Sequence, residues 1–458
     1  MSNTQEFNIR SIGDLQGKSI LILGFGIEGK SIAGYLSKNN ISFSVYDKNL
    51  EKKQELESIS HATFVSKEDF QQFEVIIRSP GIHPDAQILK TVSENALITS
   101  STKLFFDLSP TKQIIGVTGT KGKGTTSTLI CEMLQEYGED VYLGGNIGKA
   151  PFDFIDSLDQ DSWVVLEMSS FQLIDLHKSP YIAVMLMTTS EHLNYHKDIY
   201  EYVEAKRNIF RFQNEDSFAI VNQDYPASSE SDLAGEAKVY KISRDQEVFD
   251  EGCYIKNDTV ILKINGKIKE VLKAERIKLP GKHNQENVCA AVLAASLAGV
   301  DMDSIKHVLS TFTGLEHRIE FVANIQGVMY YDDSFSTTPE TAIAAIESFS
   351  QQKILILGGA SKNSDFTDLG KTISNSNSIK VIIGIGEEWQ HIKEVIENPH
   401  IQFIEGCETM EEIVHEASRR ADVGDVVVLS PACASFGMFQ NYKDRGDQFK
   451  KAVRNLTN

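Results

Sequence analysis

The stretch from Gln113 to Ile130 constrains the fold more than any other part of the chain. Its sequence, QIIGVTGTKGKGTTSTLI, is a short apolar strand followed by a glycine-rich turn and a helix-like segment. Glycines at positions 116, 119, 122 and 124 allow backbone N–H groups to close around anionic oxygens without a Cβ in the way. The start of the helix adds a partial positive charge. This layout predicts a phosphate-binding loop in an α/β domain.

In such a loop Lys123 reaches the outer phosphates, and the hydroxyl of Thr125 or Thr126 lies near a magnesium ion. The usual pattern places Ser or Thr directly after the lysine, whereas this chain has Gly124 there. A glycine-rich strand-to-helix turn that binds no ligand is therefore the alternative interpretation.

The length of the chain indicates its number of domains, and its charge excludes some classes of binding partner. At about 150 residues per domain, 458 residues suggest roughly three domains. The net charge of −19 argues against nucleic acid or an anionic membrane as the main partner. The five cysteines show no metal or redox spacing, and no apolar run reaches the roughly 18 residues of a membrane span. We therefore expect a cytoplasmic protein.

A second glycine turn lies near the start of the chain. The segment KSILILGFGIEG (18–29) is an apolar strand with a glycine turn, and a helix and a strand ending at Asp47 follow. This order predicts a Rossmann-type site with a diphosphate at the helix start and the acid on a ribose hydroxyl. Nicotinamide, flavin and other nucleotide diphosphates all remain possible ligands, as does a turn needed only for packing. The later turn Ser79-Pro80-Gly81 can present N–H groups to the same ligand.

Two strands after the phosphate loop end in groups that bind metals. Glu167 ends the strand WVVLE, and His192 follows the strand at 183–187. Because the carboxyl ends of parallel strands face the ligand crevice, both side chains should point toward Lys123 as magnesium ligands. Alternatively, His192 is a solvated loop residue. On the helix at 200–212, spacing alone favours a solvated Lys206.

The rest of the chain predicts a small β-rich lobe and a third α/β unit. Residues 215–280 alternate like strands, and the helix that follows starts with Asn284 and Asn287 one turn apart. These amides either bind an adenine edge or cap the helix, and spacing favours the cap. The third unit starts near Gly314, and Arg445 near its end is expected at the surface or in a salt bridge. Strand ends in this unit carry a set suited to a small anionic molecule, namely Thr337, Lys362, Ser435 and Tyr442.

Several segments resemble, in order and spacing, the Mur ligases. They are GVTGTKGKGTT (116–126), GGNIG (144–148), LEMSSFQL (166–173), EAKRNIF (204–210), PGKHNQEN (280–287), FTGLEHRIE (312–320) and LSPACASFGMFQNYKDRG (429–446). The resemblance covers the whole chain. It implies an α/β protein with a Rossmann-like domain at 1–110, a central P-loop ATPase-type parallel sheet at 111–313 and a second Rossmann-like domain at 314–458.

The resemblance also implies an activity. It is that of an ATP- and Mg2+-dependent, amide-forming ligase, active as a monomer, that adds D-glutamate to UDP-N-acetylmuramoyl-L-alanine through an acyl phosphate in cytoplasmic peptidoglycan precursor synthesis. The family's catalytic residues fall on Lys123, Glu167, His192 and Lys206. Its metal ligands fall on Thr125, Glu167, His192 and Lys206 as a carbamate.

The family's substrate-binding positions are also present in this chain. The ATP-binding residues correspond to Gly119, Thr120, Gly122, Lys123, Gly124, Thr125, Thr126, Asn284, Asn287, Arg318 and Asp333. The UDP-sugar residues correspond to Gly26, Ile27, Glu28, Asp47, Ser79, Pro80, Gly81 and Asn146. The amino-acid site corresponds to Thr337, Lys362, Ser435 and Tyr442, and His317 is a candidate proton acceptor.

Three positions depart from the family pattern and keep alternatives open. Gly124 replaces a Ser or Thr, Glu191 replaces an Asp, and Phe335 replaces a lysine. Because Phe335 removes a cation near the expected glutamate site, an L-glutamate-adding relative is one alternative. A dinucleotide-dependent oxidoreductase built on Gly24 to Gly29 is another, although such an enzyme has no use for a second phosphate loop at Lys123.

Overall fold

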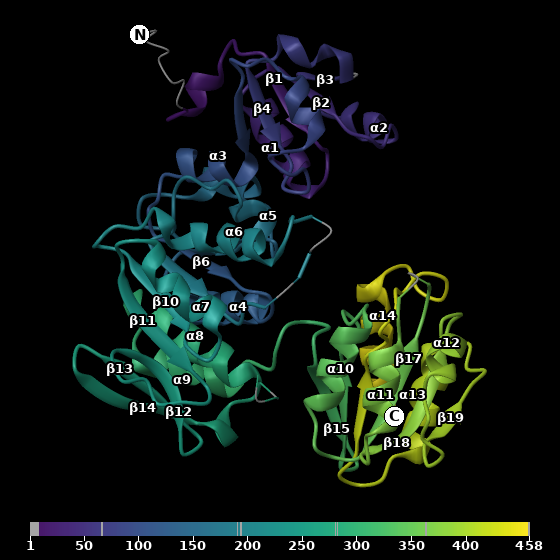
Figure 1. Ribbon diagram of the computed structural model, residues 1–458. Coiled ribbons are helices and arrows are strands. Elements are labelled where there is room, and N and C mark those ends of the chain that lie inside the picture. Colours follow the sequence, from purple (N-terminus) through teal and green to yellow (C-terminus); the bar gives the residue numbers. More distant parts are fainter. Residues whose placement is uncertain are drawn as a thin grey trace. The chain divides into compact units, whose positions relative to one another are not determined.

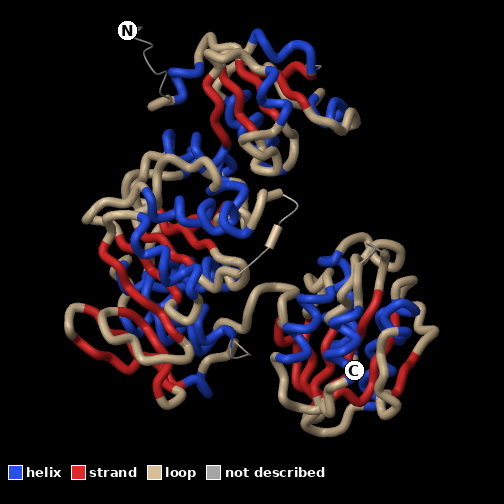
Figure 2. Tube along the Cα trace, viewed as in Figure 1, coloured by secondary structure: helices blue, strands red, loops and turns tan. Residues whose placement is uncertain are grey.

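The computed structural model describes residues 9–65, 67–189, 191–192, 195–279, 281, 283–361 and 364–456. The chain forms two compact units, one of Met1–Ala274 with Gln285–Val308 and the other of Glu275–Asn284 with Leu309–Asn458. Each sheet is shown in Figure 1, and the helices that flank it in Figure 2. Among the described helices, none is both long and apolar enough to cross a membrane.

The N-terminal part of the first unit is a five-stranded parallel sheet in the order β3-β2-β1-β4-β5. Its elements are η1 (Ile12–Leu15), β1 (Ile20–Leu23), α1 (Ile27–Lys38), β2 (Phe43–Tyr46), α2 (Lys52–Leu56), β3 (Ala62–Phe64), η2 (Lys67–Gln72), β4 (Val75–Arg78), η3 (Gln87–Thr91), β5 (Leu97–Ser100) and α3 (Ser101–Leu108). The chain leaves β1 toward β2 on one side and β4 lies on the other. This is a switch point, where α/β sheets bind ligands.

Glycine is required where β1 turns into α1. Gly24 has φ +96°, and a Cβ there would lie 2.7 Å from Cβ of Ser79. A Cβ on Gly29 would lie 2.2 Å from the carbonyl oxygen of Gly24. The turn can therefore approach both the β4 loop and its own helix only without side chains at these positions.

The central sheet has nine strands in the order β14-β13-β12-β11-β10-β9-β6-β8-β7. Its strands are β6 (Ile114–Thr118), β7 (Val141–Gly145), β8 (Trp163–Glu167), β9 (Ile182–Met185), β10 (Phe218–Asn222), β11 (Lys238–Ser243), β12 (Gly252–Lys256), β13 (Thr259–Ile264) and β14 (Lys267–Lys273). Its helices and those that follow are α4 (Lys123–Tyr137), η4 (Pro151–Asp153), η5 (Ile155–Ser157), α5 (Ser170–Leu173), α6 (Ile199–Arg211), α7 (Pro226–Ser229), η6 (Glu230–Ala234), η7 (Ala274–Arg276), α8 (His283–Leu297) and α9 (Met302–Thr311).

The β-rich lobe predicted at residues 215–280 consists of strands, but these strands belong to the central sheet and form no sheet of their own. Strands β10 and β11 continue the parallel sheet, β12 joins them in parallel, and only β13 and β14 are antiparallel. Alternation indicates strands but not which neighbours they pair with, so a sheet extension looks like a lobe in the sequence.

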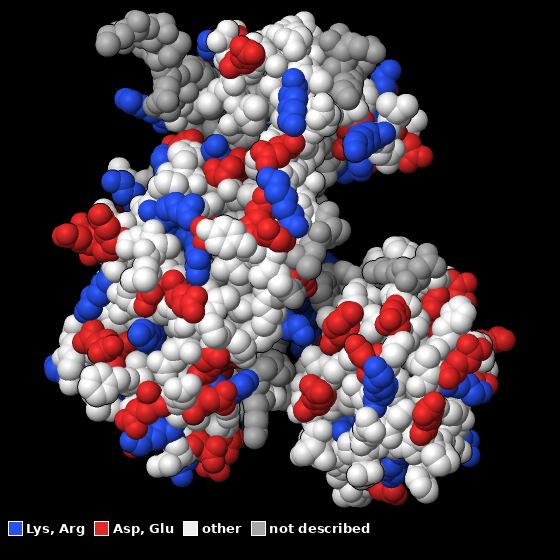
Figure 3. Space-filling model, in the orientation of Figure 1, with Lys and Arg blue, Asp and Glu red and all other residues white. Residues whose placement is uncertain are grey.

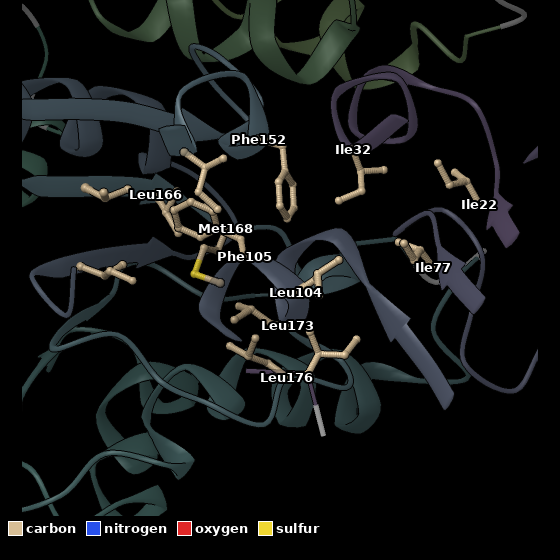
Figure 4. Close-up of a cluster of buried hydrophobic side chains, with 14 of the residues drawn as sticks. Ile22, Ile32, Ile77, Leu104, Phe105, Phe152, Leu166, Met168, Leu173 and Leu176 are labelled. Atoms are coloured by element: carbon tan, nitrogen blue, oxygen red, sulfur yellow. The ribbon is translucent and has the colours of Figure 1, made fainter. Parts of the chain in front are cut away.

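One apolar core joins the N-terminal sheet to the central sheet. Figure 4 shows side chains from both parts packed in a single cluster, which includes Ile22, Ile32, Ile77, Leu104, Phe105, Phe152, Leu166, Met168, Leu173 and Leu176. An ion pair of the buried Arg78 adds to it, since Arg78 Nη2 lies 2.6 Å from Oδ1 of the half-buried Asp175. Because burying apolar area is the main source of stability, these two sheets hold together as one unit.

The second unit contains a six-stranded sheet in the order β15-β16-β20-β17-β18-β19. Only the β15–β16 pair is antiparallel. The elements are β15 (Glu320–Ile325), β16 (Val328–Asp332), α10 (Pro339–Glu347), β17 (Lys353–Gly358), α11 (Thr367–Ser374), β18 (Ile379–Ile385), α12 (Trp389–Glu394), β19 (Gln402–Ile404), α13 (Met410–Arg420), β20 (Val426–Leu429) and α14 (Tyr442–Asn455). The predicted α/β fold with three parallel or mostly parallel sheets is thus confirmed.

Candidate active site

The loop between β6 and α4 has the backbone geometry of an anion site. Gly119 and Gly122 have φ of +149° and +88°, and a Cβ on Gly122 would lie 2.2 Å from Oδ1 of Asn287. Helix α4 begins at Lys123, and Gly122 at its N-cap has no side chain to satisfy the N–H groups of the first turn. The N-terminus of α4 therefore presents donors and a partial positive charge to a ligand.

The two threonines left open by the sequence differ in their surroundings. Thr126 is buried, and its Oγ1 donates to Oδ1 of Asn287 at 3.4 Å. Thr125 is half-buried one position earlier. Asn287 thus contacts the loop through Thr126, and Thr125 is the more accessible of the two threonines. Lys123 Nζ donates to the carbonyl oxygens of Gly119 and Thr120 at 3.0 and 2.9 Å.

Lys206 is fully buried, so its interpretation as a solvated lysine is wrong. Its Nζ donates to the carbonyl oxygen of Gly119 at 2.8 Å and lies 3.3 Å from Oγ1 of Thr118. Burial, followed by the positive charge of Lys123, lowers the pKa of Lys206 well below 10.5, while Glu191 and Glu167 act in the opposite direction. The lowered pKa enlarges the fraction of this amine that is in its neutral, nucleophilic form.

Glu167 ends β8, the immediate neighbour of β6, as the sequence predicts. Its Oε1 accepts a hydrogen bond from Nδ2 of Asn146 at 3.1 Å, and its carbonyl oxygen accepts from the N–H of Asn146 at 2.9 Å. The predicted sugar residue Asn146 therefore holds the carboxylate of the predicted metal ligand Glu167. Carboxylate and hydroxyl oxygens are the ligands that magnesium prefers, and Glu167 and Thr125 offer one of each.

His192 lies beyond the other neighbour of β6, which is β9. Its ring is exposed, lies 4.9 Å from the Phe171 ring, and has Glu191 Oε2 at 3.6 Å from Nε2. Its backbone has φ +58°, an uncommon conformation for a residue with a Cβ. Thr120 links this side of the site to α6, because its Oγ1 lies 2.9 Å from the Tyr202 hydroxyl.

On helix α6, Tyr202 and Ile209 are buried, whereas Phe212 is exposed. Helix α6 ends at Arg211, so Phe212 no longer follows its inward face. The polar contact of Tyr202 with the phosphate loop was missed. Its signal was the spacing of four residues to Lys206, which places both on one helix face.

The N-terminal switch point contains the predicted sugar-nucleotide residues. Gly26 is the N-cap of α1, and the Ile27 side chain is 80% exposed. Asp47 already accepts hydrogen bonds from the N–H groups of Phe25 at 2.6 Å and Asn49 at 2.8 Å, which fixes the glycine turn. Glu28 accepts from Gln172 Nε2 at 2.7 Å and from the Ser101 hydroxyl, and burial raises the pKa of its carboxyl group.

The Ser79-Pro80-Gly81 turn follows β4 on the other side of the switch point. Arg78, which is buried, donates through Nη1 to the carbonyl oxygens of Ser79 at 3.3 Å and Ile82 at 2.8 Å. The carbonyl oxygen of Pro80 accepts from the Tyr195 hydroxyl at 2.8 Å. The carbonyl groups of Ser79 and Pro80 thus bond to protein, while Gly81 is exposed to solvent.

In the second unit, His317 and Asp332 form a buried pair. His317 Nδ1 lies 2.8 Å from Asp332 Oδ2, and Gly446 of α14 packs against both side chains. Asp332 also accepts from the N–H of Ser334 at 2.9 Å. In the tautomer whose Nδ1–H donates to Asp332, Nε2 carries the lone pair that can accept a proton.

The predicted nucleotide residues of the second unit lie in defined positions. Asp333 is buried, accepts from the Ser430 hydroxyl at 2.7 Å and from the N–H of Ile319 at 3.2 Å. Burial raises the pKa of Asp333 to about 7 despite these bonds. The guanidinium of Arg318 lies over the Phe335 ring, and Asn284 is buried in the first turn of α8.

The predicted amino-acid residues are only partly covered by the structure. Ser435 is buried, Thr337 is half-buried, and Tyr442 begins α14 with its ring edge-on to Phe335 at 5.0 Å. Lys362 lies outside the described residues.

Arg445 is fully buried, so its expected surface position is wrong. It donates to Oγ and the carbonyl oxygen of Ser334, each at 2.9 Å, and to the carbonyl oxygens of Cys433 and Ala434. Burial lowers its pKa to about 10. The guanidinium holds the segment after β16, which carries Phe335 and Thr337, to the segment after β20, which carries Ser435.

On the face drawn in Figure 3, Lys and Arg side chains are interspersed with Asp and Glu rather than gathered in one patch. This agrees with the net charge of −19 and with a ligand held by individual residues rather than by a broad basic surface.

Comparisons with known protein families match three segments of the chain. The Mur ligase MurD-like N-terminal domain matches residues 18–99, the Mur ligase middle domain residues 117–295, and the Mur ligase glutamate ligase domain residues 317–433. These matches cover the N-terminal, central and C-terminal sheets respectively.

Relatives and solved structures agree with these matches. The UDP-N-acetylmuramoylalanine--D-glutamate ligase of Acetivibrio thermocellus is 38% identical over 96% of this chain and 97% of its own length. The enzyme of the same name from Clostridioides difficile is 37% identical over 97% and 100%. The MurF ligase of Thermotoga maritima in complex with ADP covers all of both chains at 16% identity, with a TM-score of 0.57. A pseudomurein peptide ligase type C from Methanothermus fervidus covers 96% of this chain and 100% of its own, at 17% identity and a TM-score of 0.56.

Proposed function

The chain belongs to the Mur ligase family, and on this premise we propose that it is the ATP-dependent ligase that adds D-glutamate to UDP-N-acetylmuramoyl-L-alanine in the cytoplasm. The full-length similarity to ligases of that name, at 37–38% identity, carries the proposal. The phosphate loop beside a buried lysine with a lowered pKa supports it, because both features serve a reaction that activates a carboxylate with ATP.

The proposal assigns the main binding segments of each ligand to a different sheet, with domain boundaries near residues 110 and 313. The turns at Gly26–Glu28 and Ser79–Gly81 hold the UDP sugar, the loop at Gly119–Thr126 holds the triphosphate, and the segments after β16, β17 and β20 hold glutamate. The remaining nucleotide contacts are Asn284, Asn287, Arg318 and Asp333. The protein acts as a monomer.

The donor set near the phosphate loop fits magnesium. Thr125 and Glu167 would hold the ion together with His192 and a carbamate on Lys206, and the ion would neutralise charge on the transferred phosphoryl group. A carbamate forms when the neutral amine of Lys206 attacks carbon dioxide and loses one proton, so the depressed pKa of Lys206 favours it. The carbamate is an anion, so Lys123, which disfavours a protonated Lys206, attracts it instead.

The residues of the chain then have distinct tasks in the reaction. A free carboxylate is a poor acyl donor, so the γ-phosphoryl group of ATP is first transferred to the alanyl carboxylate, giving an acyl phosphate and ADP. Lys123 and Arg318 stabilise the negative charge of this transfer. The neutral amine of glutamate then attacks the acyl carbon, phosphate leaves, and Nε2 of His317 accepts the proton.

L-Glutamate is the alternative substrate to test, because Phe335 replaces the lysine that the family pattern places near the glutamate site. The experiment is release of inorganic phosphate with ATP, Mg2+ and UDP-N-acetylmuramoyl-L-alanine, adding D-glutamate, L-glutamate or another amino acid in turn. We expect release with D-glutamate. Release with L-glutamate alone would assign the L-glutamate-adding activity, and ATP hydrolysis that ignores the UDP sugar would reject the proposed function.

A further inference from the structure

Tyr195 connects the segment that carries His192 to the loop after β4. Its hydroxyl donates to the carbonyl oxygen of Pro80 at 2.8 Å, and its N–H donates to the carbonyl oxygen of His192 at 2.9 Å. Its ring stacks on Phe171 at 4.0 Å, and Phe171 also contacts the His192 ring. Burial raises the pKa of Tyr195 to about 12, so the hydroxyl remains a donor at neutral pH.

The bond from the Tyr195 hydroxyl to the Pro80 carbonyl oxygen also sets the direction of the Gly81 N–H group. The peptide between Pro80 and Gly81 is trans, so its carbonyl and its N–H point in opposite directions. With the Pro80 oxygen fixed by Tyr195, the Gly81 N–H is turned away from Tyr195. Gly81 is exposed and belongs to the turn proposed to hold the sugar diphosphate, where an oriented N–H is a ligand donor.

The other carbonyl groups of the turn bond to a different residue. Arg78 holds the carbonyl oxygens of Ser79 and Ile82, and Arg78 itself belongs to β4. Those bonds fix the turn locally. Only the Pro80 bond, among these three, reaches the segment of His192.

A second link between the same segments serves as a comparison. Lys197 Nζ lies 2.6 Å from Asp85 Oδ2, but both side chains are about two-thirds exposed, at 65% and 64%. Exposed ion pairs of this kind contribute little to stability. A coupling between the segments should therefore depend on Tyr195 and not on Lys197.

We propose that Tyr195 is a positioning residue that couples the Ser79-Pro80-Gly81 turn to His192, so that the sugar-nucleotide site and the metal site are set together. The proposal rests on the proposed function for the identity of the two ligands. The contact itself, between an aromatic hydroxyl and a backbone carbonyl, does not depend on it.

The test is Tyr195→Phe, which removes only the hydroxyl and keeps the stacked ring. We expect the KM for UDP-N-acetylmuramoyl-L-alanine and the Mg2+ concentration for half-maximal rate each to rise about five- to tenfold, the effect of one buried hydrogen bond. The KM for ATP at saturating Mg2+ should stay within about twofold of the wild-type value. Lys197→Met, the matched control, should leave all three unchanged.

A second measurement does not depend on activity. Hydrogen exchange of the unliganded protein should be faster in peptides covering Ser79–Ile82 in Tyr195→Phe, and unchanged in Lys197→Met. Equal changes in Tyr195→Phe and Lys197→Met would overturn the coupling. So would a Tyr195→Phe variant with an unchanged KM for the UDP sugar, an unchanged Mg2+ requirement and unchanged exchange. If exchange is faster in Tyr195→Phe than in the wild type, but the wild-type protein never uses this UDP sugar, the proposed function is rejected and the coupling stands.

Discussion

The guanidinium carbon of Arg318 lies 4.0 Å from the centroid of the Phe335 ring. Phe335 in turn meets Tyr442 edge-on at 5.0 Å, and its N–H donates to the carbonyl oxygen of His317 at 2.9 Å. The residue that departs from the family pattern thus contacts the arginine proposed to bind ATP and the tyrosine proposed to bind the amino acid. Phe335 thus replaces the positively charged lysine of the family pattern by an aromatic ring whose face attracts a cation.

Phe335→Leu should therefore weaken ATP binding by loosening Arg318. A half-exposed cation–π contact is worth about 0.5–1 kcal/mol, so we expect the KM for ATP to rise about two- to fivefold. Phe335→Lys should raise it further, because the new cation repels Arg318. Phe335→Tyr keeps the aromatic face and is the control. Steady-state kinetics at saturating sugar nucleotide measure these changes, and a Lys variant with unchanged KM would show that the stacking has no role.

Mutation of the two neighbouring threonines should have two different effects. Thr125→Ala should raise the Mg2+ concentration for half-maximal rate about tenfold, because it removes a proposed metal oxygen. Thr126→Ala should instead lower the thermal midpoint, since it breaks a buried bond to Asn287 and leaves a small cavity. Titration with Mg2+ and thermal unfolding distinguish the two. The reverse pattern would move the metal to Thr126.

The local features of this site could be predicted from the sequence. The burial of its side chains and its contacts between distant residues could not. The phosphate loop and Glu167 were located because glycine spacing and a strand-end acid are properties of a few adjacent residues. From the residues alone, Lys206 was predicted to be solvated and Arg445 to lie at the surface or in a salt bridge, because helical spacing gives the face of a side chain and not what covers that face. The Tyr195–Pro80 bond joins residues 115 positions apart, and no local pattern reports such a pair.

Lys206 should make the stability of the protein depend on pH. Because burial lowers its pKa well below the ordinary 10.5, the unfolded chain binds more protons than the folded chain between these two pKa values. Stability therefore rises with pH through this range, and the cost of the buried amine disappears above 10.5. We expect Lys206→Met to raise the thermal midpoint most near neutral pH, with a gain that shrinks as the pH approaches 10.5.

The measurement compares both proteins by thermal unfolding across this range in buffers free of carbon dioxide, so that no carbamate forms. Adding bicarbonate should stabilise only the wild-type protein and raise its activity. A difference between the two proteins that is constant with pH would contradict a depressed pKa for Lys206.

Gly446→Ala should separate His317 from Asp332. A Cβ at position 446 would lie 2.2 Å from Nδ1 of His317 and 2.5 Å from Oδ2 of Asp332, so one of the two side chains must move. Without Asp332 the imidazole is no longer held with its proton on Nδ1, and Nε2 loses its role as acceptor. General-base catalysis contributes about a hundredfold or more to a rate, and we expect a loss of that order in kcat.

The kinetics should also identify the step that is lost. Transfer of the phosphoryl group to the alanyl carboxylate does not need the base, so formation of ADP in a single turnover without glutamate should persist in Gly446→Ala. Lys451→Ala, an exposed change on the same helix α14, is the control and should leave kcat unchanged. If ADP formation falls together with kcat, the His317–Asp332 pair acts before the amine attacks, and its assignment as the proton acceptor is wrong.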